Sequence, residues 1–474
     1  MINVSCCCPL LFLSFFNPQI MTLVSETLNG GKTHLSSGDA NLNFFFQAGA
    51  SRTMQEDEIL HSFQAACDKD KRLAFKTLLW ARDCRGGAGE RRLFNVIASN
   101  LLKQSSIHYS HFVYHTATQF GSWKDVFTLE PAYELVQFAA GGIVAKDGLC
   151  CKWMPRKGPW FEAVRKYMRL TPKELRKGLV EYSNTVEQKM CSKNWIEIDY
   201  KTVPSVAMSR YKNTFSSRDP LRYGQYIQRV LEGKDKMNAS VAFPHDVLRN
   251  IDNEAATIAQ WESLPDLLQD TTKNILPVCD VSGSMCTPAS GSVSCMDICV
   301  GMGLYIAERQ RGQFKNMFMT FSSRPELQHL TGDNVVENMH QLQMADWGMN
   351  TDFRLTFMEL LDYARMYNVS QELMPEIILV FSDMEFDQAD RANTDYEWLD
   401  KLYAQHGYKR PQLVFWNLNA RPGNVPVTVD DNGTALVSGY SPNILRTVLS
   451  DDMNPYQIML DTVDVDRYTL RGLF

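Results

Sequence analysis

Three short stretches of the sequence carry oxygen-bearing side chains at spacings that suit a hard cation. The stretch D-V-S-G-S at 280–284 places two hydroxyls after a carboxylate, one residue apart. A loop hydroxyl follows at Thr351, and the segment EIILVFSD ends in a second carboxylate at Asp383. Magnesium takes near-octahedral oxygen ligands at about 2.0–2.1 Å and keeps several waters, so a few closely placed side chains suffice. The sequence predicts a site for Mg²⁺ or another divalent cation at Asp280, Ser282, Ser284, Thr351 and Asp383.

Two buried strands are expected to position these side chains. Apolar runs at 275–279 and 377–381 each end in one of the carboxylates. Ligands of open α/β sheets bind at the carboxyl ends of the strands, where the two runs would bring the oxygens together. Two alternatives remain open: the D-V-S-G-S stretch is an ordinary strand-to-turn segment with a helix cap, or a bound metal is purely structural.

The spacing of apolar residues along the chain changes near residue 270. After it, strand-like runs alternate with helical segments, which is typical of a Rossmann-like, doubly wound parallel sheet. The expected strands are 275–279, 314–321, 377–381, 413–417 and 435–439, and the expected helices are 293–311, 351–367, 396–406 and 442–449. We expect this α/β domain to span residues 272–474.

The first half of the chain reads as helices joined by short connections. Helical spacing of apolar residues predicts helices at 40–49, 55–69, 72–83, 92–103, 110–119 and 125–140. Thr171-Pro172-Lys173-Glu174 is a capping box with proline at the first helical position. We expect residues 28–264 to form an α-helical repeat domain, and residues 1–27 to be an N-terminal extension that is disordered or upstream of the true start. Met21 is the candidate start, and a targeting segment in the first 20 residues is the alternative.

Charge is distributed unevenly between the two halves. Residues 51–250 carry about 32 Lys and Arg against about 21 Asp and Glu, whereas 251–474 carry about 15 against about 31. A basic lobe attracts polyanions, which favours nucleic acid on the first half; mutual attraction of the two lobes is the alternative. The twelve cysteines lack paired zinc-site spacing, and no apolar run is long enough to cross a membrane, so we expect a cytoplasmic protein with reduced thiols.

Basic residues gather in three places in the first half. The loop 82–92 combines glycines and arginines and is expected either to cradle a phosphate with its backbone N–H groups or to form a tight interhelical turn. The stretch 151–160 interleaves aromatics with cations, a mixture that suits unpaired bases, and the helices after it add a cationic face. The candidate RNA-binding residues are Arg85, Arg91, Arg92, Lys152, Arg156, Lys157, Arg165, Lys166, Lys173 and Lys177.

Several longer motifs resemble known families. D-x-S-x-S, a later Thr and a later Asp resemble the metal-ion-dependent adhesion site (MIDAS) of von Willebrand factor A domains. The whole chain resembles a viral, phage and plant family of unknown function and, by domain order, the Ro/TROVE group. The motifs are NLNFFFQAGASR (41–52), RDCRGGAGERRLF (82–94), KWMPRKG (152–158), VEQKMCSKNWIEIDYKTVPSVAMSRY (186–211), FPHDVL (243–248), LPVCDVSGSM (276–285) and VFWNLN (414–419).

The resemblance implies a non-enzymatic, Ro-like ribonucleoprotein component. Its HEAT-like helical repeats would bind single-stranded or structured small RNA, and its von Willebrand factor A domain would hold the divalent ion. The alternative is a protein-interaction module in which the metal keeps one position open for a partner's carboxylate. A metal-dependent hydrolase is disfavoured, because no histidine lies in the metal-site stretches to serve as a general base.

Overall fold

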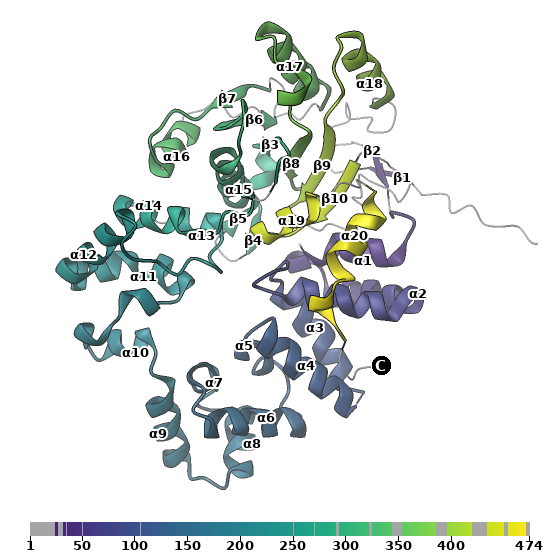
Figure 1. Ribbon diagram of the computed structural model, residues 1–474. Helices are drawn as coiled ribbons and strands as arrows, with labels where there is room; N and C mark the ends of the chain where they lie inside the picture. The colour runs from purple at the N-terminus through teal and green to yellow at the C-terminus, as the bar shows by residue number, and fades with distance from the viewer. Residues whose placement is uncertain are drawn as a thin grey trace, which may run out of the picture.

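The computed structural model describes residues 24–26, 32–34, 36–49, 51–104, 106–249, 251–269, 271–290, 293–321, 325–343, 353–384, 396–419, 434–449 and 454–470. Helices occupy the chain up to residue 262, and from residue 275 a sheet alternates with helices (Figure 1). The expected order, a helical part followed by a largely parallel α/β part, is confirmed. Thr351 and most of the expected N-terminal extension lie outside the described residues, which begin at the small hairpin of β1 (Val24–Glu26) and β2 (Lys32–His34).

The helical part consists of short and medium helices joined by tight turns. Its α-helices are α1 (Ala40–Ala48), α2 (Glu56–Arg82), α3 (Arg91–Leu102), α4 (Ile107–Gln119), α5 (Trp123–Val126), α6 (Tyr133–Val144), α7 (Gly148–Trp153), α8 (Pro159–Tyr167), α9 (Pro172–Ser183), α10 (Val186–Cys191), α11 (Ser205–Arg218), α12 (Pro220–Leu231), α13 (Pro244–Leu248) and α14 (Glu254–Glu262). The 3-10 turns are η1 (Ser51–Thr53), η2 (Trp195–Glu197) and η3 (Tyr200–Thr202).

Local sequence explains where several of these helices bend or stop. Asp70 has non-helical dihedrals inside α2, and its carboxylate accepts a hydrogen bond from Leu73 N at 3.0 Å, so the two helices expected there form one kinked helix. The single helix expected at 125–140 is wrong. Pro131 lacks an N–H and disfavours helical backbone before it, so α5 ends at Val126 and α6 starts at Tyr133. The Thr171–Glu174 capping box is confirmed.

Six strands form the central sheet of the described α/β part, in the order β10-β9-β8-β3-β6-β7. All neighbours are parallel except β7, which pairs antiparallel with β6 at the edge. The chain goes from β3 to β6 on one side and later to β8 on the other, so the topological switch lies between β3 and β8. The strands are β3 (Ile275–Asp280), β6 (Met317–Phe321), β7 (Leu327–His329), β8 (Ile377–Ser382), β9 (Gln412–Asn417) and β10 (Thr434–Ser438).

Helices and short turns surround this sheet. Helix α15 (Cys295–Arg309) packs against β3, β6 and β8, and Ser294 and Asp297 form a capping box at its start. The other elements are η4 (Gly283–Cys286), β4 (Pro288–Ser290), β5 (Val293–Ser294), α16 (Val335–Gln343), α17 (Phe353–Met366), η5 (Gln371–Leu373), α18 (Tyr396–Gln405), η6 (Pro442–Ile444), α19 (Leu445–Val448), α20 (Pro455–Val463) and η7 (Asp466–Tyr468). The edge strand β7 and the helices α16 and α20 were not expected from the sequence.

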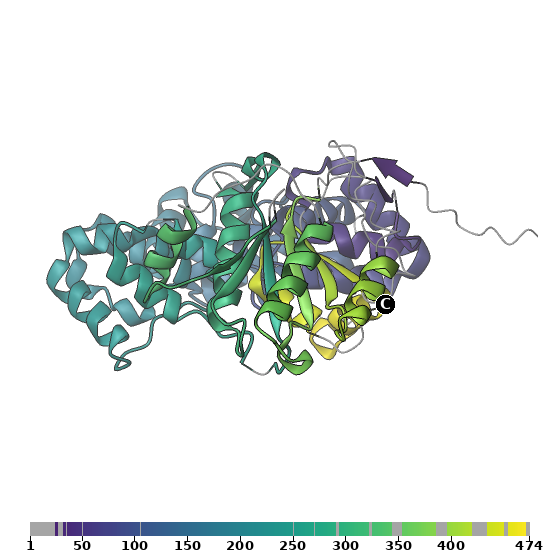
Figure 2. The same ribbon diagram turned by 90° about the horizontal axis from the view of Figure 1, so that it is seen from above.

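The two parts close into a ring of elements. The helices follow an arc from α1 and α2, through α8 and α9, to α13 and α14, and the α/β part lies between its two ends (Figure 1). In the view from above, α10–α14 lie on one side of the sheet and α1 and α2 on the other (Figure 2). Helix α1 contacts β10 and α20 at one end of the arc, and α13 and α14 contact α15 and α16 at the other.

Polar contacts fix both ends of the arc. At the first end, Gly49 N donates to Ser438 Oγ at 3.1 Å, and Lys76 Nζ lies 2.7 Å from Asp464 Oδ1. At the second, Trp261 Nε1 donates to Glu308 Oε2 at 2.6 Å, and Arg309 donates to the Trp261 carbonyl at 2.7 Å.

Buried side chains form two apolar cores. One continuous apolar core runs from α1 through α9 and into the sheet, while residues 198–259 contribute a second, separate core built around Tyr200, Phe215 and Tyr223. Within the part of the chain that the structure describes, no disulfide joins two cysteines, and no helix is both long and apolar enough to cross a bilayer.

Candidate functional site

The D-V-S-G-S stretch leaves the sheet at the topological switch point. Strand β3 ends at Asp280, whose Oδ1 accepts a hydrogen bond from Ser282 N at 2.9 Å, so the turn folds back over the strand end. Residues 283–286 then form the 3-10 turn η4. The local sequence thus fixes the Asp280 carboxylate and the following serines at the carboxyl edge of the sheet.

The second carboxylate reaches the same place from the neighbouring strand. Asp383 follows β8, and its Oδ1 accepts a hydrogen bond from Ser284 Oγ at 3.2 Å. Ser284 Oγ lies 3.0 Å from Ser282 Oγ. Adjacent ligands of an octahedral magnesium at 2.0–2.1 Å lie about 3 Å apart, so these oxygens have the spacing such an ion requires. The donor set, hydroxyls and carboxylates, is also of the hard-oxygen type that Mg²⁺ prefers.

Ser382 is a member of the site that sequence reasoning missed. It is the last residue of β8, and its hydroxyl donates to Asp280 Oδ2 at 2.6 Å while accepting from Met384 N at 3.0 Å. With both Asp280 oxygens engaged by hydrogen bonds, the orientation of this carboxylate is fixed. The available signal was a hydroxyl directly before Asp383 in EIILVFSD.

The carboxylates of the site are buried, whereas its glycine–serine turn reaches the surface. Asp280 and Asp383 are fully buried, whereas Gly283 is exposed and Ser284 is half-buried. Burial of two carboxylates calls for a compensating positive charge or hydrogen bonds. Within the described residues, no group of three or more His, Cys, Asp or Glu could hold a metal ion.

The glycine- and arginine-rich loop 82–92 forms a turn held by hydrogen bonds within the protein. The backbone N–H groups of residues 84–88 and 90 all donate to protein acceptors, among them the Asp83 carboxylate, which accepts from Arg85 N at 2.9 Å and Gly86 N at 3.1 Å. Because these amides already donate to protein acceptors, they do not cradle a phosphate. The hydrogen bonds agree with the alternative interpretation, a tight turn between two helices. The other Asp83 oxygen accepts from Arg467 and from the Tyr468 hydroxyl, which holds the C-terminal segment.

A second candidate site is a group of cations contributed by four helices of the arc. The pKa of Lys124 in α5 is lowered, first by partial burial and then by three neighbouring cations, Arg91 of α3, Arg210 of α11 and Lys152 of α7. We call these four residues the inner cation cluster. Sequence reasoning selected Arg91 and Lys152 but missed Lys124 and Arg210, which lie in stretches of ordinary charge.

Trp153 lies within this cluster. Lys124 Nζ is 4.5 Å and Lys152 Nζ 5.2 Å from the centre of its indole ring, both in cation–π geometry. Two members of the cluster are also paired with acids: Lys152 with Glu187 at 2.9 Å, and Arg91 with Asp125 at 2.9 Å. Asp125 is also paired with the buried Arg82. The two arginines, Arg82 and Arg91, therefore share one carboxylate and together with it retain a positive charge.

The remaining RNA candidates are spread over the surface. Arg85 is exposed, and Arg92 donates to the Ser51 carbonyl at 3.2 Å. Arg156 is half-buried, which lowers its pKa, and Arg165 is bonded to Glu162 at 2.8 Å. The exposed candidates are Lys157 and, on α8 and α9, Lys166, Lys173 and Lys177. Helices α8 and α9 lie on the part of the arc opposite the sheet (Figure 1), and α9 packs against α7, the helix that carries Lys152.

Comparison with known proteins gives matches without a described function. Residues 274–466 match a family described as a domain of unknown function (DUF7788), and residues 149–275 match another (DUF2828). Their meeting point, at 274–275, coincides with the start of β3. The uncharacterized protein L728 of Acanthamoeba polyphaga mimivirus is 27% identical over 521 residues, covering 96% of this chain and 89% of the viral protein. A viral relative that spans both parts agrees with the two-part viral family noted in the sequence.

Among solved structures, the crystal structure of the Ro (RSR) protein of Deinococcus radiodurans is similar over 86% of this chain and 90% of that chain. The sequence identity is 14% and the TM-score 0.35.

Proposed function

We propose that this protein is a non-enzymatic, cytoplasmic RNA-binding protein, and that its RNA lies against the inner cation cluster. The proposal rests chiefly on one observation: Arg91, Lys152 and Arg210 come from three other helices spread along the arc, yet each helps to lower the pKa of Lys124. A lysine surrounded by other cations gains from a polyanion that neutralises the whole group, and a phosphate chain is such a polyanion.

Trp153 favours a nucleic acid over a simple polyanion. An aromatic ring beside several cations matches the combination that single-stranded nucleic-acid sites use, with bases stacked on the ring and phosphates neutralised beside it. Lys124 and Lys152 lie over the indole, and RNA phosphates would draw them away from it. The resemblance of the sequence to the Ro/TROVE group, with its HEAT-like repeats, agrees with RNA as the ligand.

The α/β part would be a von Willebrand factor A-type domain that carries Mg²⁺ at its MIDAS. Ser282, Ser284 and Asp383 would supply oxygen ligands, with Asp280 held by Ser382, and Thr351 would complete the set. When bound, the ion supplies positive charge at the strand ends of an otherwise acidic part.

A second candidate is a protein-interaction module that uses this metal site. The exposure of Gly283 and the partial exposure of Ser284 favour it, because a partner's carboxylate would then have access to the ion. A protein partner that dissociates on addition of chelator or with Asp280→Ala, while RNA binding is unchanged, would establish this function separately.

The test of RNA binding is charge reversal within the cluster. Lys124→Glu combined with Arg210→Glu should weaken single-stranded RNA binding, measured by fluorescence anisotropy, by at least about tenfold. It should also make the log–log salt slope shallower by about 0.7 for each RNA phosphate that the variant no longer neutralises. Lys401→Glu on α18, an exposed lysine in the α/β part, is the matched control and should change neither value. Equal affinities for the two variants would refute the proposal.

A further inference from the structure

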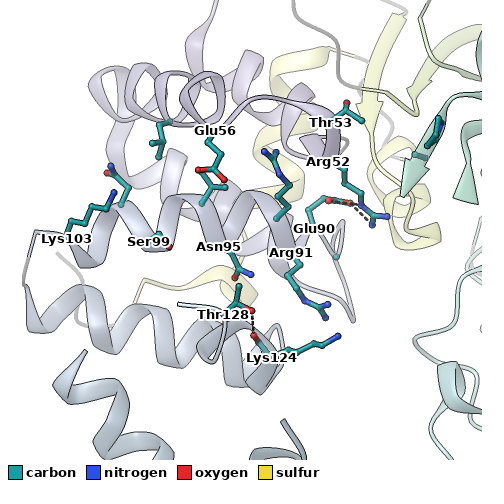
Figure 3. Close-up of a pocket in the computed structure, with 17 residues that line it drawn as sticks. Arg52, Thr53, Glu56, Glu90, Arg91, Asn95, Ser99, Lys103, Lys124 and Thr128 are labelled. Carbon is teal, nitrogen blue, oxygen red and sulfur yellow. Dashed lines mark hydrogen bonds and ion pairs between the residues drawn. The ribbon is translucent and has the colours of Figure 1, made fainter. Parts of the chain in front are cut away.

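A large pocket adjoins the inner cation cluster. Its volume is about 1010 Å³, and it lies between α2, α3 and α5, with one wall from β4 (Figure 3). The lining residues on which the argument rests are Arg52, Glu90, Arg92, Asn95, Lys103 and Lys124. We call it the α3 pocket. A cavity of this size accommodates a ligand of several hundred daltons or a segment of a polymer.

The lining of the α3 pocket is cationic. Its two acids include Glu90, which is fully buried and paired with Arg52 at 2.8 Å. Among the residues that the structure describes, none forms an ion pair with Arg92, Lys103 or Lys124, although Lys124 is near Asp125. Three cations without an ion-pair partner around one cavity indicate an anionic ligand.

The start of α3 adds to this positive potential. Gly89, Glu90, Arg91 and Arg92 line the pocket, so the first turn of this twelve-residue helix borders it. Glu90 stands at the N-cap position, but its side chain is bonded to Arg52 and makes no capping hydrogen bond. The first N–H groups of an uncapped helix bind anions, and phosphates in particular.

The other lining residues restrict the kind of anion. No aromatic side chain lines the pocket in the described part of the chain, so it offers no surface on which a base would stack. Asn95 projects toward Thr128 (Figure 3), and its buried Oδ1 has no hydrogen-bond donor among the described residues. A rotation of the Asn95 side chain would present this oxygen to a ligand that carries a hydroxyl group close to its phosphates, and ribose in RNA carries one at the 2′ position.

We propose that the α3 pocket binds the ribose–phosphate backbone of RNA without reading its bases. Arg92 and Lys103 neutralise phosphates, the start of α3 donates to them, and Asn95 Oδ1 accepts from a 2′-hydroxyl. This inference deepens the proposed function and rests on it. It adds Arg52, Asn95 and Lys103 to the residues that face the ligand.

The pocket also connects the RNA to the candidate metal loop. Pro288 and Ala289 belong to β4, which begins four residues after Ser284 and contacts η1. Thr287 N donates to the Ser284 carbonyl at 3.0 Å, so the wall of the pocket and the metal loop form one continuous turn. RNA in the pocket would therefore lie against the strand that directly follows the metal loop.

The test compares variants of residues that line only the pocket with variants of the inner cation cluster. Arg92→Gln combined with Lys103→Gln should weaken binding of a short single-stranded RNA by about tenfold, and inorganic tripolyphosphate should compete with RNA on the unaltered protein but not on this variant. Lys401→Gln is the control. The single variant Lys103→Gln, at an exposed position, should show a smaller loss and guards against misfolding of the double variant.

The bases and the 2′-hydroxyl are tested separately. Homopolymers of different bases should bind with similar affinity, and the protein should prefer RNA to DNA of the same sequence. Asn95→Leu should reduce that preference. Equal affinity of the unaltered protein for RNA and DNA, or a preference that Asn95→Leu leaves unchanged, overturns the assignment of Asn95.

Failure of this inference and failure of the proposed function give different results. If the Lys124 and Arg210 variant loses RNA binding while the Arg92 and Lys103 variant does not, the inner cation cluster binds RNA and the pocket inference is wrong. If the unaltered protein binds tripolyphosphate through Arg92 and Lys103 but binds no RNA, the pocket takes phosphates from another source, and RNA as its ligand is wrong.

Discussion

Ser284 donates its hydroxyl hydrogen to Asp383 over 3.2 Å, although 99 residues separate the two in the chain. This hydrogen bond joins the ends of β3 and β8 across the topological switch point, where open α/β sheets bind their ligands. Hydroxyl and carboxylate oxygens at this spacing form a hydrogen-bonded pair without an ion, and can become adjacent ligands of an octahedral ion when one binds. The hydrogen-bonded pair and the ion-bound pair contribute different amounts to the free energy of unfolding.

Magnesium should therefore stabilise the protein through Ser284. A ligand at a hundredfold excess over its Kd raises the free energy of unfolding by about 2.7 kcal/mol, so the thermal midpoint should rise on addition of Mg²⁺ and fall with chelator. Ser284→Ala should remove most of the Mg²⁺ effect, while Ser192→Ala, at an exposed serine of the helical part, should retain it. A thermal midpoint that does not respond to Mg²⁺ in the unaltered protein contradicts the metal site.

Asp83 should be a principal anchor of the C-terminal segment. It is fully buried and accepts hydrogen bonds from Arg467, the Tyr468 hydroxyl and two backbone N–H groups. Asp83→Asn leaves Arg467 without its charged partner and should cost about 2–4 kcal/mol in the free energy of unfolding measured with urea. The neighbouring exposed carboxylate offers a matched control: Asp466→Asn should cost less than about 0.5 kcal/mol.

His245 should make the protein less stable in mild acid. Burial lowers its pKa to about 4, from an ordinary value near 6.5, so the folded state holds the neutral imidazole. The unfolded chain then takes up this proton first as the pH falls. The contribution is fully present above about pH 6.5 and is lost at about 1.4 kcal/mol per pH unit down to about pH 4.

The measurement is the free energy of unfolding at about pH 7 and about pH 5, in the unaltered protein and in His245→Gln. Carboxylates titrate in both proteins, so the difference between them isolates the histidine. His245→Gln should lose less stability between the two values. An identical loss in both proteins would show that His245 keeps an ordinary pKa in the folded state.

The sequence predicted the elements of the fold better than their arrangement. Strands β3 and β8 are continuous apolar runs, and the kink at Asp70 coincides with a gap in the helical pattern. Pro131 is a readable signal for the break between α5 and α6, although the apolar spacing alone favours one helix there. The closure of the ring was not predictable, because contacts such as Asp83 with Arg467 join residues 384 positions apart and leave no local pattern.

The candidate sites also contain some residues that could be predicted from the sequence and others that could not. Asp280, Ser282 and Ser284 could be selected because a strand end followed by alternating hydroxyls is a local signature. Lys124 and Arg210 could not be selected from the sequence, since each lies in a stretch of ordinary composition. Only the curvature of the arc brings the two residues near each other. Conversely, the loop 82–92 has the composition of a phosphate cradle, but its amides are used by the Asp83 turn and by α2.

The most direct test of RNA binding inside the arc is photo-crosslinking of the unaltered protein to single-stranded RNA that contains 4-thiouridine, followed by mapping of the linked peptides. The account predicts crosslinks on the peptides that carry Lys124, Trp153 and Arg210, and their disappearance with excess unlabelled RNA. Crosslinks confined to α8 and α9, or to the acidic α/β part, would contradict it.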